Sequence, residues 1–330
     1  MELFFPSYYH SFQCLAGACP DSCCKEWTVD VDPESARYYR QLDGALGDRL
    51  RQVLTDTPDG TVMTIENGRC PMWQQDGLCR IQAELGHSAL CKTCREFPRL
   101  THDYGDFVEL GLELSCPEAA RLILTYPGGL LMQAQPGGTE PEYDQEVMVV
   151  LRQSRKAALS FLRNAENIPQ ALAAILLYAY DVQAAIDGGL ALCSTPDACV
   201  TQIPKFSDSG NMLQIFAFFR NLEILTPKWR QHLDAATAEI VWSDPLRNLA
   251  CYMFERYWLQ AVSDFDLVCR VKLAIIACLL IAALGGDVIE TAQLFSKEIE
   301  NSSDNVNAIL DGAYSATALT DANLLALLHF

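Results

Sequence analysis

Near its start the chain reads Cys14-Leu15-Ala16-Gly17-Ala18-Cys19-Pro20-Asp21-Ser22-Cys23-Cys24, which places four cysteines within eleven residues. Five more follow in Gly68-Arg69-Cys70-Pro71, Asp76-Gly77-Leu78-Cys79, Leu90-Cys91-Lys92-Thr93-Cys94 and Ser115-Cys116-Pro117. Nine of the 14 cysteines therefore lie between residues 14 and 116. Thiols at this density form either a disulfide framework or a metal site, and the two alternatives imply different kinds of protein.

Length and composition favour the metal alternative. With 330 residues, half of them hydrophobic and a fifth charged, the chain can bury a sizeable core and has no need of disulfides for stability. Its first residues, Met1-Glu2-Leu3-Phe4-Phe5-Pro6, lack the basic and apolar regions of a signal peptide. We therefore expect a cytoplasmic protein, whose cysteines stay reduced and are better suited to ligating a metal than to forming bridges.

Charge and hydropathy argue against two classes of partner. The formal net charge of −18 disfavours binding to nucleic acids and to anionic membrane surfaces, because both require clustered Lys and Arg. The longest apolar run, 273–284, has 12 residues, whereas a helix needs about 20 to cross a bilayer. We expect neither a nucleic acid nor a membrane as partner. The acidic surface suits a basic partner, although solubility alone explains it equally well.

The hydrophobic pattern predicts a mainly α-helical protein in two parts. Residues 1–126 are expected to form a Cys-rich metal-binding domain with short strands at 27–31, 61–65 and 107–114 and helices near 33–54, 80–85 and 117–124. Two Gly-Gly pairs mark a linker over 127–141. Beyond it, apolar residues recur at helical spacing, which predicts an all-helical domain over 142–330 with helices at 142–165, 169–187, 210–223, 227–241, 245–262, 265–284, 287–299 and 319–329.

The cysteine spacing leaves the kind of metal open. Zinc takes four thiolates in a closed tetrahedron, and a [4Fe–4S] cluster also takes four. The irregular spacing from Cys14 to Cys24 matches neither a paired zinc-knuckle pattern nor a ferredoxin run. Nine thiols are more than one such metal site can use. Either two metal sites exist, or some of the cysteines lie beside the ligands without binding the metal. The five cysteines beyond residue 141 are scattered, and we expect them to be small buried hydrophobes.

Several motifs together resemble the flagellin lysine-N-methylase (FliB) family. They are Phe12-x-Cys14-x4-Cys19-x3-Cys23-Cys24-x2-Trp27-x-Val29-x-Val31-Asp32, Asn67-Gly68-Arg69-Cys70-Pro71, Asp76-Gly77-Leu78-Cys79-Arg80-Ile81-Gln82, Cys91-x-Thr93-Cys94-Arg95-x2-Pro98-Arg99 and Glu113-x-Ser115-Cys116-Pro117-Glu118. The resemblance covers roughly residues 8–125, and a weaker similarity lies at 248–271. Parts of the pattern are also similar to the broader family of zinc- or iron-chelating CxxCxxCC domains.

The resemblance implies a methyltransferase. Members of the family transfer a methyl group from S-adenosylmethionine to the ε-amines of lysines on flagellin and carry an iron–sulfur cluster. It follows that the metal ligands come from Cys14, Cys19, Cys23, Cys24, Cys70, Cys79, Cys91, Cys94 and Cys116. Radical chemistry on the donor would be expected to need Cys-x3-Cys-x2-Cys, and the third place after Cys19 and Cys23 falls on Glu26. We therefore expect direct transfer of the methyl group.

Direct transfer suggests roles for five further residues. The attacking lysine must be neutral although its free pKa is near 10.4, so Glu113 is a candidate base. Aromatic rings suit a positive sulfonium, which points to Tyr104 and Trp27 near the cysteine motifs. Arg95 and Arg99 are candidates for the carboxylate of the donor. Each residue also has a simpler role open to it, as a packing aromatic or a surface ion pair.

Two hypotheses from different classes remain. The first is a lysine methyltransferase whose cluster is either a structural staple or an open iron that holds the donor. The second is a non-enzymatic zinc- or iron-binding module whose helical domain docks a partner protein. Binding of S-adenosylmethionine distinguishes them, because a metal-handling module has no reason to bind it.

Overall fold

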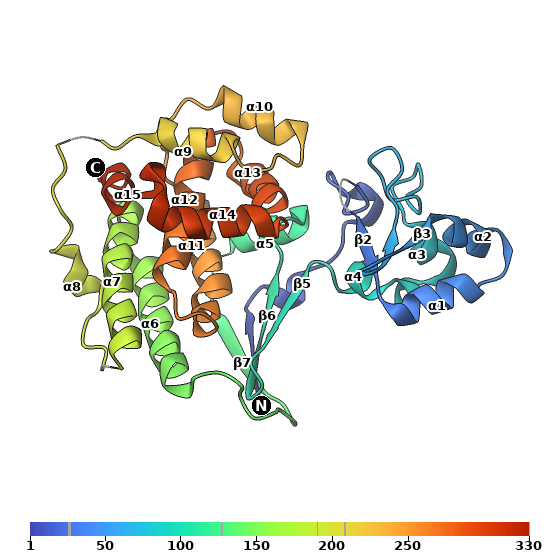
Figure 1. Cartoon of the computed structure of the whole chain (residues 1–330), viewed down its shortest axis with the longest axis horizontal. Coiled ribbons are helices and arrows are strands. Elements are labelled where there is room, and N and C mark those ends of the chain that lie inside the picture. The colour runs from blue at the N-terminus through green and yellow to red at the C-terminus, as the bar shows by residue number, and fades with distance from the viewer. Residues whose placement is uncertain (26–27, 127, 190, 208, 330) are drawn as a thin grey trace.

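The protein is described by a computed structural model that covers residues 1–330 except 26–27, 127, 190, 208 and 330 (Figure 1). It is mainly helical with a few short strands, as the sequence predicts. Its helices are α1 Pro33–Gln41, α2 Gly44–Val53, α3 Arg80–Leu85, α4 Lys92–Glu96, α5 Pro117–Thr125, α6 Gln145–Asn164, α7 Ile168–Gly188, α8 Pro196–Val200, α9 Met212–Arg220, α10 Pro227–Ala235, α11 Asp244–Tyr257, α12 Val268–Leu284, α13 Val288–Phe295, α14 Ser303–Ser315 and α15 Asp321–Leu327.

Seven strands form two sheets. The strands are β1 Glu2–Pro6, β2 Val29–Val31, β3 Leu54–Thr57, β4 Gly60–Met63, β5 Arg99–Asp103, β6 Phe107–Leu112 and β7 Leu130–Ala134. The larger sheet has the order β5-β6-β1-β7, and β1 runs parallel to β6 and antiparallel to β7. The smaller sheet, β2-β4-β3, is antiparallel. The N-terminal strand is thus held by partners more than a hundred residues further along the chain.

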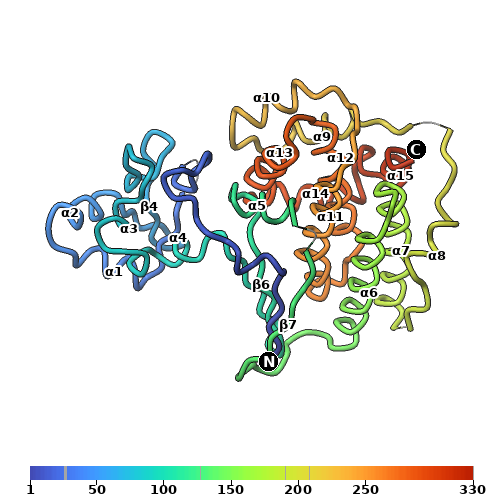
Figure 2. The backbone as a smooth tube through the Cα atoms, turned by 180° about the vertical axis from the view of Figure 1, so that it is seen from behind, coloured from blue at the N-terminus to red at the C-terminus, as the bar shows by residue number. Residues whose placement is uncertain are grey.

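Two hydrophobic cores divide the molecule. The small core lies within residues 24–94, which we call the cysteine lobe, and includes Tyr39 and Leu50. The large core joins α6–α15 with α5, β6 and the N-terminal aromatic residues, including Tyr8 and Phe12. We call this second unit the helical body. Figures 1 and 2 show the lobe projecting to one side of the larger sheet, with the helices of the body on the other side.

This division differs from the predicted domains 1–126 and 142–330. Residues 1–12 and 99–125 belong to the helical body, where α5 packs against α11 and α13. The expected linker over 127–141 contains β7, which completes the larger sheet beside β1. Glycine pairs indicate only that the chain turns, and two of these four glycines, Gly137 and Gly138, do have strongly positive φ angles.

Local signals located most helices correctly. Asp32 caps α1 by accepting a hydrogen bond from the backbone N–H of Ser35 at 3.0 Å, and Pro33 occupies the first turn. All eight helices predicted after residue 141 are present, although α10 ends at Ala235 and α11 continues as a 3-10 helix, Trp258–Val262. The sequence analysis missed α4, α8 and α14 and the strands β1, β3, β5 and β7.

Helix α14 was missed because its sequence is polar and contains glycine. Gly312 lies against another helix: a Cβ atom there would meet the ring of Phe218 at 2.9 Å. This requirement comes from tertiary packing, which local propensity does not reveal. Four of the five later cysteines, Cys199, Cys251, Cys269 and Cys278, are buried as expected, whereas Cys193 is exposed, so the prediction for it was wrong.

The two most apolar helices lie in the helical body. Helix α12 contains the longest apolar run and buries all but its last residue. Among the described residues, α7 is the one helix long and apolar enough to cross a membrane, and most of it is buried against α6, α8 and α12. Burial within the protein accounts for the composition of both helices.

Candidate metal centre

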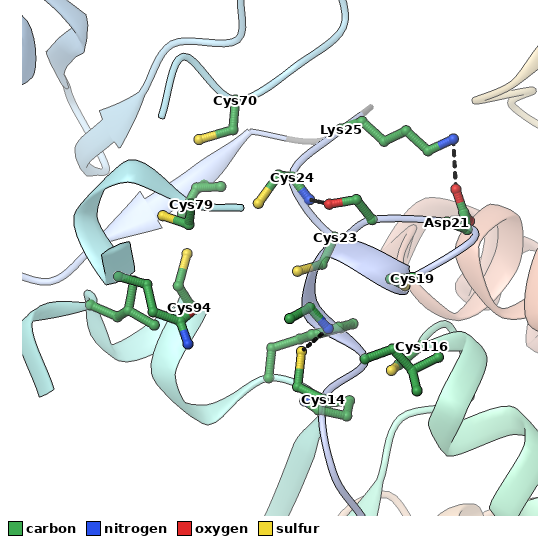
Figure 3. Close-up of a pocket in the computed structure, with 18 of the residues that line it drawn as sticks. Cys14, Cys19, Asp21, Cys23, Cys24, Lys25, Cys70, Cys79, Cys94 and Cys116 are labelled. Atoms are coloured by element: carbon green, nitrogen blue, oxygen red, sulfur yellow. Dashed lines mark hydrogen bonds and ion pairs between the residues drawn. The ribbon is translucent and has the colours of Figure 1, made fainter. Parts of the chain in front are cut away.

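All nine cysteines between residues 14 and 116 line one cavity of about 550 Å³. Figure 3 labels all of them except Cys91. The cavity lies between the cysteine lobe and the helical body. Its wall on the side of the body includes Leu225, Thr226, Lys297 and Asn301. Residues from the segment 14–116 and residues near positions 226 and 300 thus line the same cavity.

Turns and helix starts position the thiols. The loop that carries Cys14 and Cys19 contains a 3-10 turn, Ala16–Ala18. Cys79, Cys91 and Cys116 each occupy the position before the first residue of a helix, α3, α4 and α5. The backbone N–H groups at a helix start are available to a thiolate, and those of Ala119 and Glu118 bond to Cys116.

Asp32 joins two of these elements. Its Oδ1 caps α1, and its Oδ2 accepts a hydrogen bond from the backbone N–H of Lys92 at 2.7 Å, at the start of α4. Thr93 adds a hydrogen bond of 2.9 Å from its Oγ1 to the backbone oxygen of Asp30. The helix that carries Cys94 is therefore fixed to β2 and α1, which turns its thiol towards the cavity.

Burial keeps most of the thiols protonated. It raises the pKa of Cys79 and raises that of Cys116 to about 11. Cys24 differs, because it accepts hydrogen bonds from Cys23 and Cys70, which lower its pKa to about 3. A hydrogen bond from Cys94 likewise lowers the pKa of Cys91. Filling the cavity with metal ions would require further thiols to lose their protons.

The thiols surround a volume and do not converge on a point. Among the residues that the structure describes, no three side chains of His, Cys, Asp or Glu are close enough to hold one metal ion. A mononuclear zinc site needs four ligands at about 2.0–2.3 Å from one ion. Around the cavity, by contrast, direct thiol contacts form a chain, Cys23–Cys24–Cys70, and a separate pair, Cys91–Cys94.

An ionic contact ties the cysteine loop to the helical body. The carboxylate of Asp21 accepts from Lys25 Nζ at 2.6 Å, from Lys297 Nζ at 2.9 Å and from Gln293 Nε2 at 2.8 Å. The same Gln293 amide donates to the backbone oxygen of Ser115 at 2.7 Å. Burial alone would raise the pKa of Asp21, but the hydrogen bonds from both lysines lower it to about 2. The sequence analysis missed this contact, because its partners lie far apart in the chain.

A turn of π-helix contributes residues to the wall of the cavity. It spans Ser296–Glu300 directly after α13 and carries Lys297. Glu298 on the same turn accepts a hydrogen bond from the backbone N–H of Leu225 at 2.8 Å, which fixes another lining residue. Such turns insert one extra residue into a helix and occur frequently at functional sites.

The predicted donor-binding residues lie in different places. Arg99 lines the cavity, with its guanidinium 5.3 Å from the centroid of the Phe12 ring. Arg95 is not among the lining residues, and its Nη1 donates to the backbone oxygen of Leu90 at 3.1 Å. Trp27 lies outside the described residues.

The predicted catalytic residues are also separated. Tyr104 lies away from the cavity, where its ring stacks on Phe107 at 4.7 Å between centroids, and burial raises its pKa. Glu113 does not line the cavity itself but is hydrogen-bonded to two residues that do. It accepts a hydrogen bond from Ser115 Oγ at 2.8 Å, and it is also hydrogen-bonded to Asn301. Burial raises the pKa of Glu113.

Behind Glu113 lies a buried polar network. Glu300 accepts a hydrogen bond from Tyr257 Oη at 2.9 Å and pairs with Arg256 at 3.3 Å. Arg256 Nη1 donates to Tyr252 Oη at 2.6 Å. A second part of the network contains the ion pair between Arg155 and Glu109. These side chains connect the larger sheet with α6, α11 and the π-helical turn, so they fix the wall on which Glu113 and Asn301 lie.

Comparison with known proteins identifies relatives. No protein-family model and no solved structure matches the chain. The flagellar biosynthetic protein FliU of Salmonella muenchen is 31% identical over 140 residues, which cover 38% of this chain and 79% of that protein. The lysine-N-methylases of Salmonella typhimurium and Salmonella choleraesuis show the same identity over 140 residues, but the match covers 33% of their length.

The match therefore spans about a third of each lysine-N-methylase and most of the shorter flagellar relative. At this identity and coverage the predicted resemblance to the flagellin lysine-N-methylase family is confirmed. The chain belongs to the FliB lysine-N-methylase family.

Proposed function

We propose that this protein is a protein-lysine N-methyltransferase that uses S-adenosylmethionine, acts on flagellin and holds a [4Fe–4S] cluster in the cysteine-lined cavity. One observation carries the proposal: nine thiols line the same cavity as Arg99, Lys297 and Asn301, one hydrogen bond away from a buried carboxylate. The names of the relatives support lysine methylation, and that of the flagellar relative supports a flagellar substrate.

The donor set suits an iron–sulfur cluster better than zinc. A cluster takes each of its four thiolates at a different iron, so its ligands surround a volume. The cavity offers this arrangement, and its thiols have no common point of the kind zinc requires. When bound, a cluster supplies four iron–thiolate bonds that stabilise the fold, or an iron that is open to a ligand. The nine cysteines of the cavity would hold it.

The reaction is a displacement at a sulfonium methyl. The lysine nitrogen forms a bond to the methyl carbon while the carbon–sulfur bond breaks, and the electron pair of that bond stays on sulfur. The nitrogen must be neutral beforehand, so its proton has to leave a group whose free pKa is near 10.4. Desolvation in the cavity lowers that pKa and favours the neutral amine.

Glu113 is the candidate acceptor of the proton. Its raised pKa makes it a stronger base than an exposed carboxylate, and Ser115 and Asn301 connect it to the cavity by hydrogen bonds. Arg99 is the candidate for the donor's carboxylate, because it lines the cavity and a guanidinium binds a carboxylate in a bidentate manner. Arg95 is a weaker candidate, since its guanidinium is engaged by a backbone oxygen.

Anaerobic purification followed by three measurements tests the proposal. Iron, acid-labile sulfide and the visible spectrum report the cluster, calorimetry with S-adenosylmethionine reports donor binding, and mass spectrometry of flagellin reports methylated lysines. The proposal requires all three signals. Colourless protein with stoichiometric zinc would refute the cluster, and a failure to bind S-adenosylmethionine would refute the methyltransferase.

A further inference from the structure

The nine thiols fall into two sets by the part of the fold that holds them. Five of them pack in the small core of the cysteine lobe, and we call them the lobe set: Cys24, Cys70, Cys79, Cys91 and Cys94. The other four lie outside that core, towards the helical body, and we call them the junction set: Cys14, Cys19, Cys23 and Cys116. Cys116 packs against the large core.

Most contacts between thiols follow the same division; the hydrogen bond between Cys23 and Cys24 crosses it. In the lobe set, Cys24 is hydrogen-bonded to Cys70 and Cys91 to Cys94, and Cys79 interacts electrostatically with Cys24 and Cys91. In Figure 3, Cys24, Cys70, Cys79 and Cys94 lie on one side of the view. The lobe set is therefore a connected group within one rigid core.

The junction set is connected in the same way. Cys116 interacts electrostatically with Cys19 and Cys14, and Cys23 interacts with Cys14 and Cys116. In Figure 3 these four lie below and to the right of the lobe set. The interactions between the two sets involve Cys23 or Cys24, which are neighbours in the chain.

We propose that the cavity holds two iron–sulfur clusters, one ligated by Cys14, Cys19, Cys23 and Cys116 and the other by four cysteines of the lobe set. The inference rests on the proposed cluster chemistry and deepens it. A [4Fe–4S] cluster takes four thiolates, the junction set supplies four, and the lobe set supplies four with one to spare. A single cluster would leave five of the nine thiols that line the cavity without a metal.

The two sites have different surroundings. The lobe site is enclosed by a small core, so its metal–thiolate bonds add to the stability of a unit with few other apolar contacts. The junction site adjoins Asp21, Ser115 and Lys297, on the wall that leads to Glu113. The junction cluster is therefore the one adjacent to the proposed chemistry, and the lobe cluster is structural.

Iron and sulfide counts on the full chain test the division. We expect about eight irons and eight sulfides per chain in the anaerobically prepared protein, twice the content of one [4Fe–4S] centre. Cys14→Ser/Cys116→Ser and Cys70→Ser/Cys79→Ser should each lose about half of both. Cys193→Ser, at an exposed cysteine far from the cavity, is the matched control and should lose none.

Electron paramagnetic resonance provides a second readout. Because Cys23 and Cys24 are adjacent, two clusters bound through them would lie close enough for their spins to interact. The reduced protein should give a broadened signal that simplifies to a single-cluster signal in either double variant.

The outcomes separate the inference from the function it rests on. About four irons in the unsubstituted protein, with all of them lost in one double variant, would overturn the second site and leave the methyltransferase intact. The absence of iron and sulfide would overturn the cluster itself. If a double variant fails to fold, the count for the unsubstituted protein still decides between one site and two.

Discussion

Asp21 and Lys297 are 276 positions apart in the sequence, and their side chains form an ion pair of 2.9 Å at the edge of the cysteine cavity. Asp21 belongs to the loop that carries four cysteines, and Lys297 belongs to the π-helical turn after α13. Through this contact the helical body fixes the position of the loop. The position of this cavity wall therefore depends on a contact between two parts of the chain that are far apart in sequence.

Lys297→Met should loosen the cysteine loop. A hydrogen bond to a charged group contributes about 1.5–3 kcal/mol when buried, and partial exposure of this pair favours the lower end. We expect a loss of about 1.5 kcal/mol in the free energy of unfolding and faster proteolysis near residues 14–24. Arg40→Met removes an exposed pair with Asp56 and is the control, which should change the free energy of unfolding much less. Equal losses in both variants would contradict a tethering role.

Glu109→Gln should destabilise the protein strongly. Glu109 pairs with Arg155 inside the protein, where the two side chains are 9% and 7% exposed. Removing one charge leaves the other buried without a counter-charge, which typically costs about 3–5 kcal/mol. Denaturant unfolding measures the loss. Glu109→Leu/Arg155→Met removes both charges and should recover most of it, so a double variant as unstable as Glu109→Gln would contradict this explanation.

The stability of the fold should fall as pH falls below about 6.5. Burial lowers the pKa of His102, and the charge of Arg256 lowers it further, while Glu109 opposes them. The unfolded chain therefore binds a proton near pH 6.5, before the folded protein does. Stability is full above that pH and is lost as the pH falls towards the lowered pKa. His102→Gln should flatten this part of the curve, whereas His10→Gln, at an exposed histidine, should leave it unchanged.

Local chemistry made part of this structure predictable. Asp32-Pro33 marks a helix start by capping and by the fixed φ of proline, and both act within one turn. The crowding of thiols likewise indicated a metal-binding region and left the number of sites open, and Glu113 was singled out near the cysteine motifs. In each case the signal and the structure lie within a few residues of each other.

Long-range contacts account for what the sequence did not reveal. Strand β1 pairs with β6 and β7, so the apparent domain boundary at 126 lies inside a shared sheet. Tyr104 is close to the cysteines in sequence, but it follows β5 and packs against the large core, where it stacks on Phe107. Sequence separation is a poor guide to distance once a chain crosses between two cores.

Glu113→Gln should abolish most of the methyl transfer without emptying the cavity. Loss of a general base typically lowers the rate by 10²–10⁴. Because burial raises the pKa of Glu113, the rate for the unsubstituted protein should rise with pH as the carboxyl loses its proton, and this limb should vanish in the variant. Glu118→Gln is the control, since Glu118 also lines the cavity but is held by Arg121 at 2.7 and 2.8 Å. A pH limb that persists in Glu113→Gln would assign the base elsewhere.

Removal of the metal should unfold the cysteine lobe and leave the helical body folded. The described core of the lobe has 13 buried hydrophobic residues, two of which are the cavity cysteines Cys70 and Cys91, whereas the body has a far larger core of its own. Metal–thiolate bonds in such a unit contribute directly to folding. We expect iron chelation under anaerobic conditions to abolish amide-exchange protection in α1 and α2 while protection in α7 and α12 persists. Protection that is lost together in α1 and α12 would show that the two cores unfold as one unit, and protection kept in both would show that the lobe needs no metal.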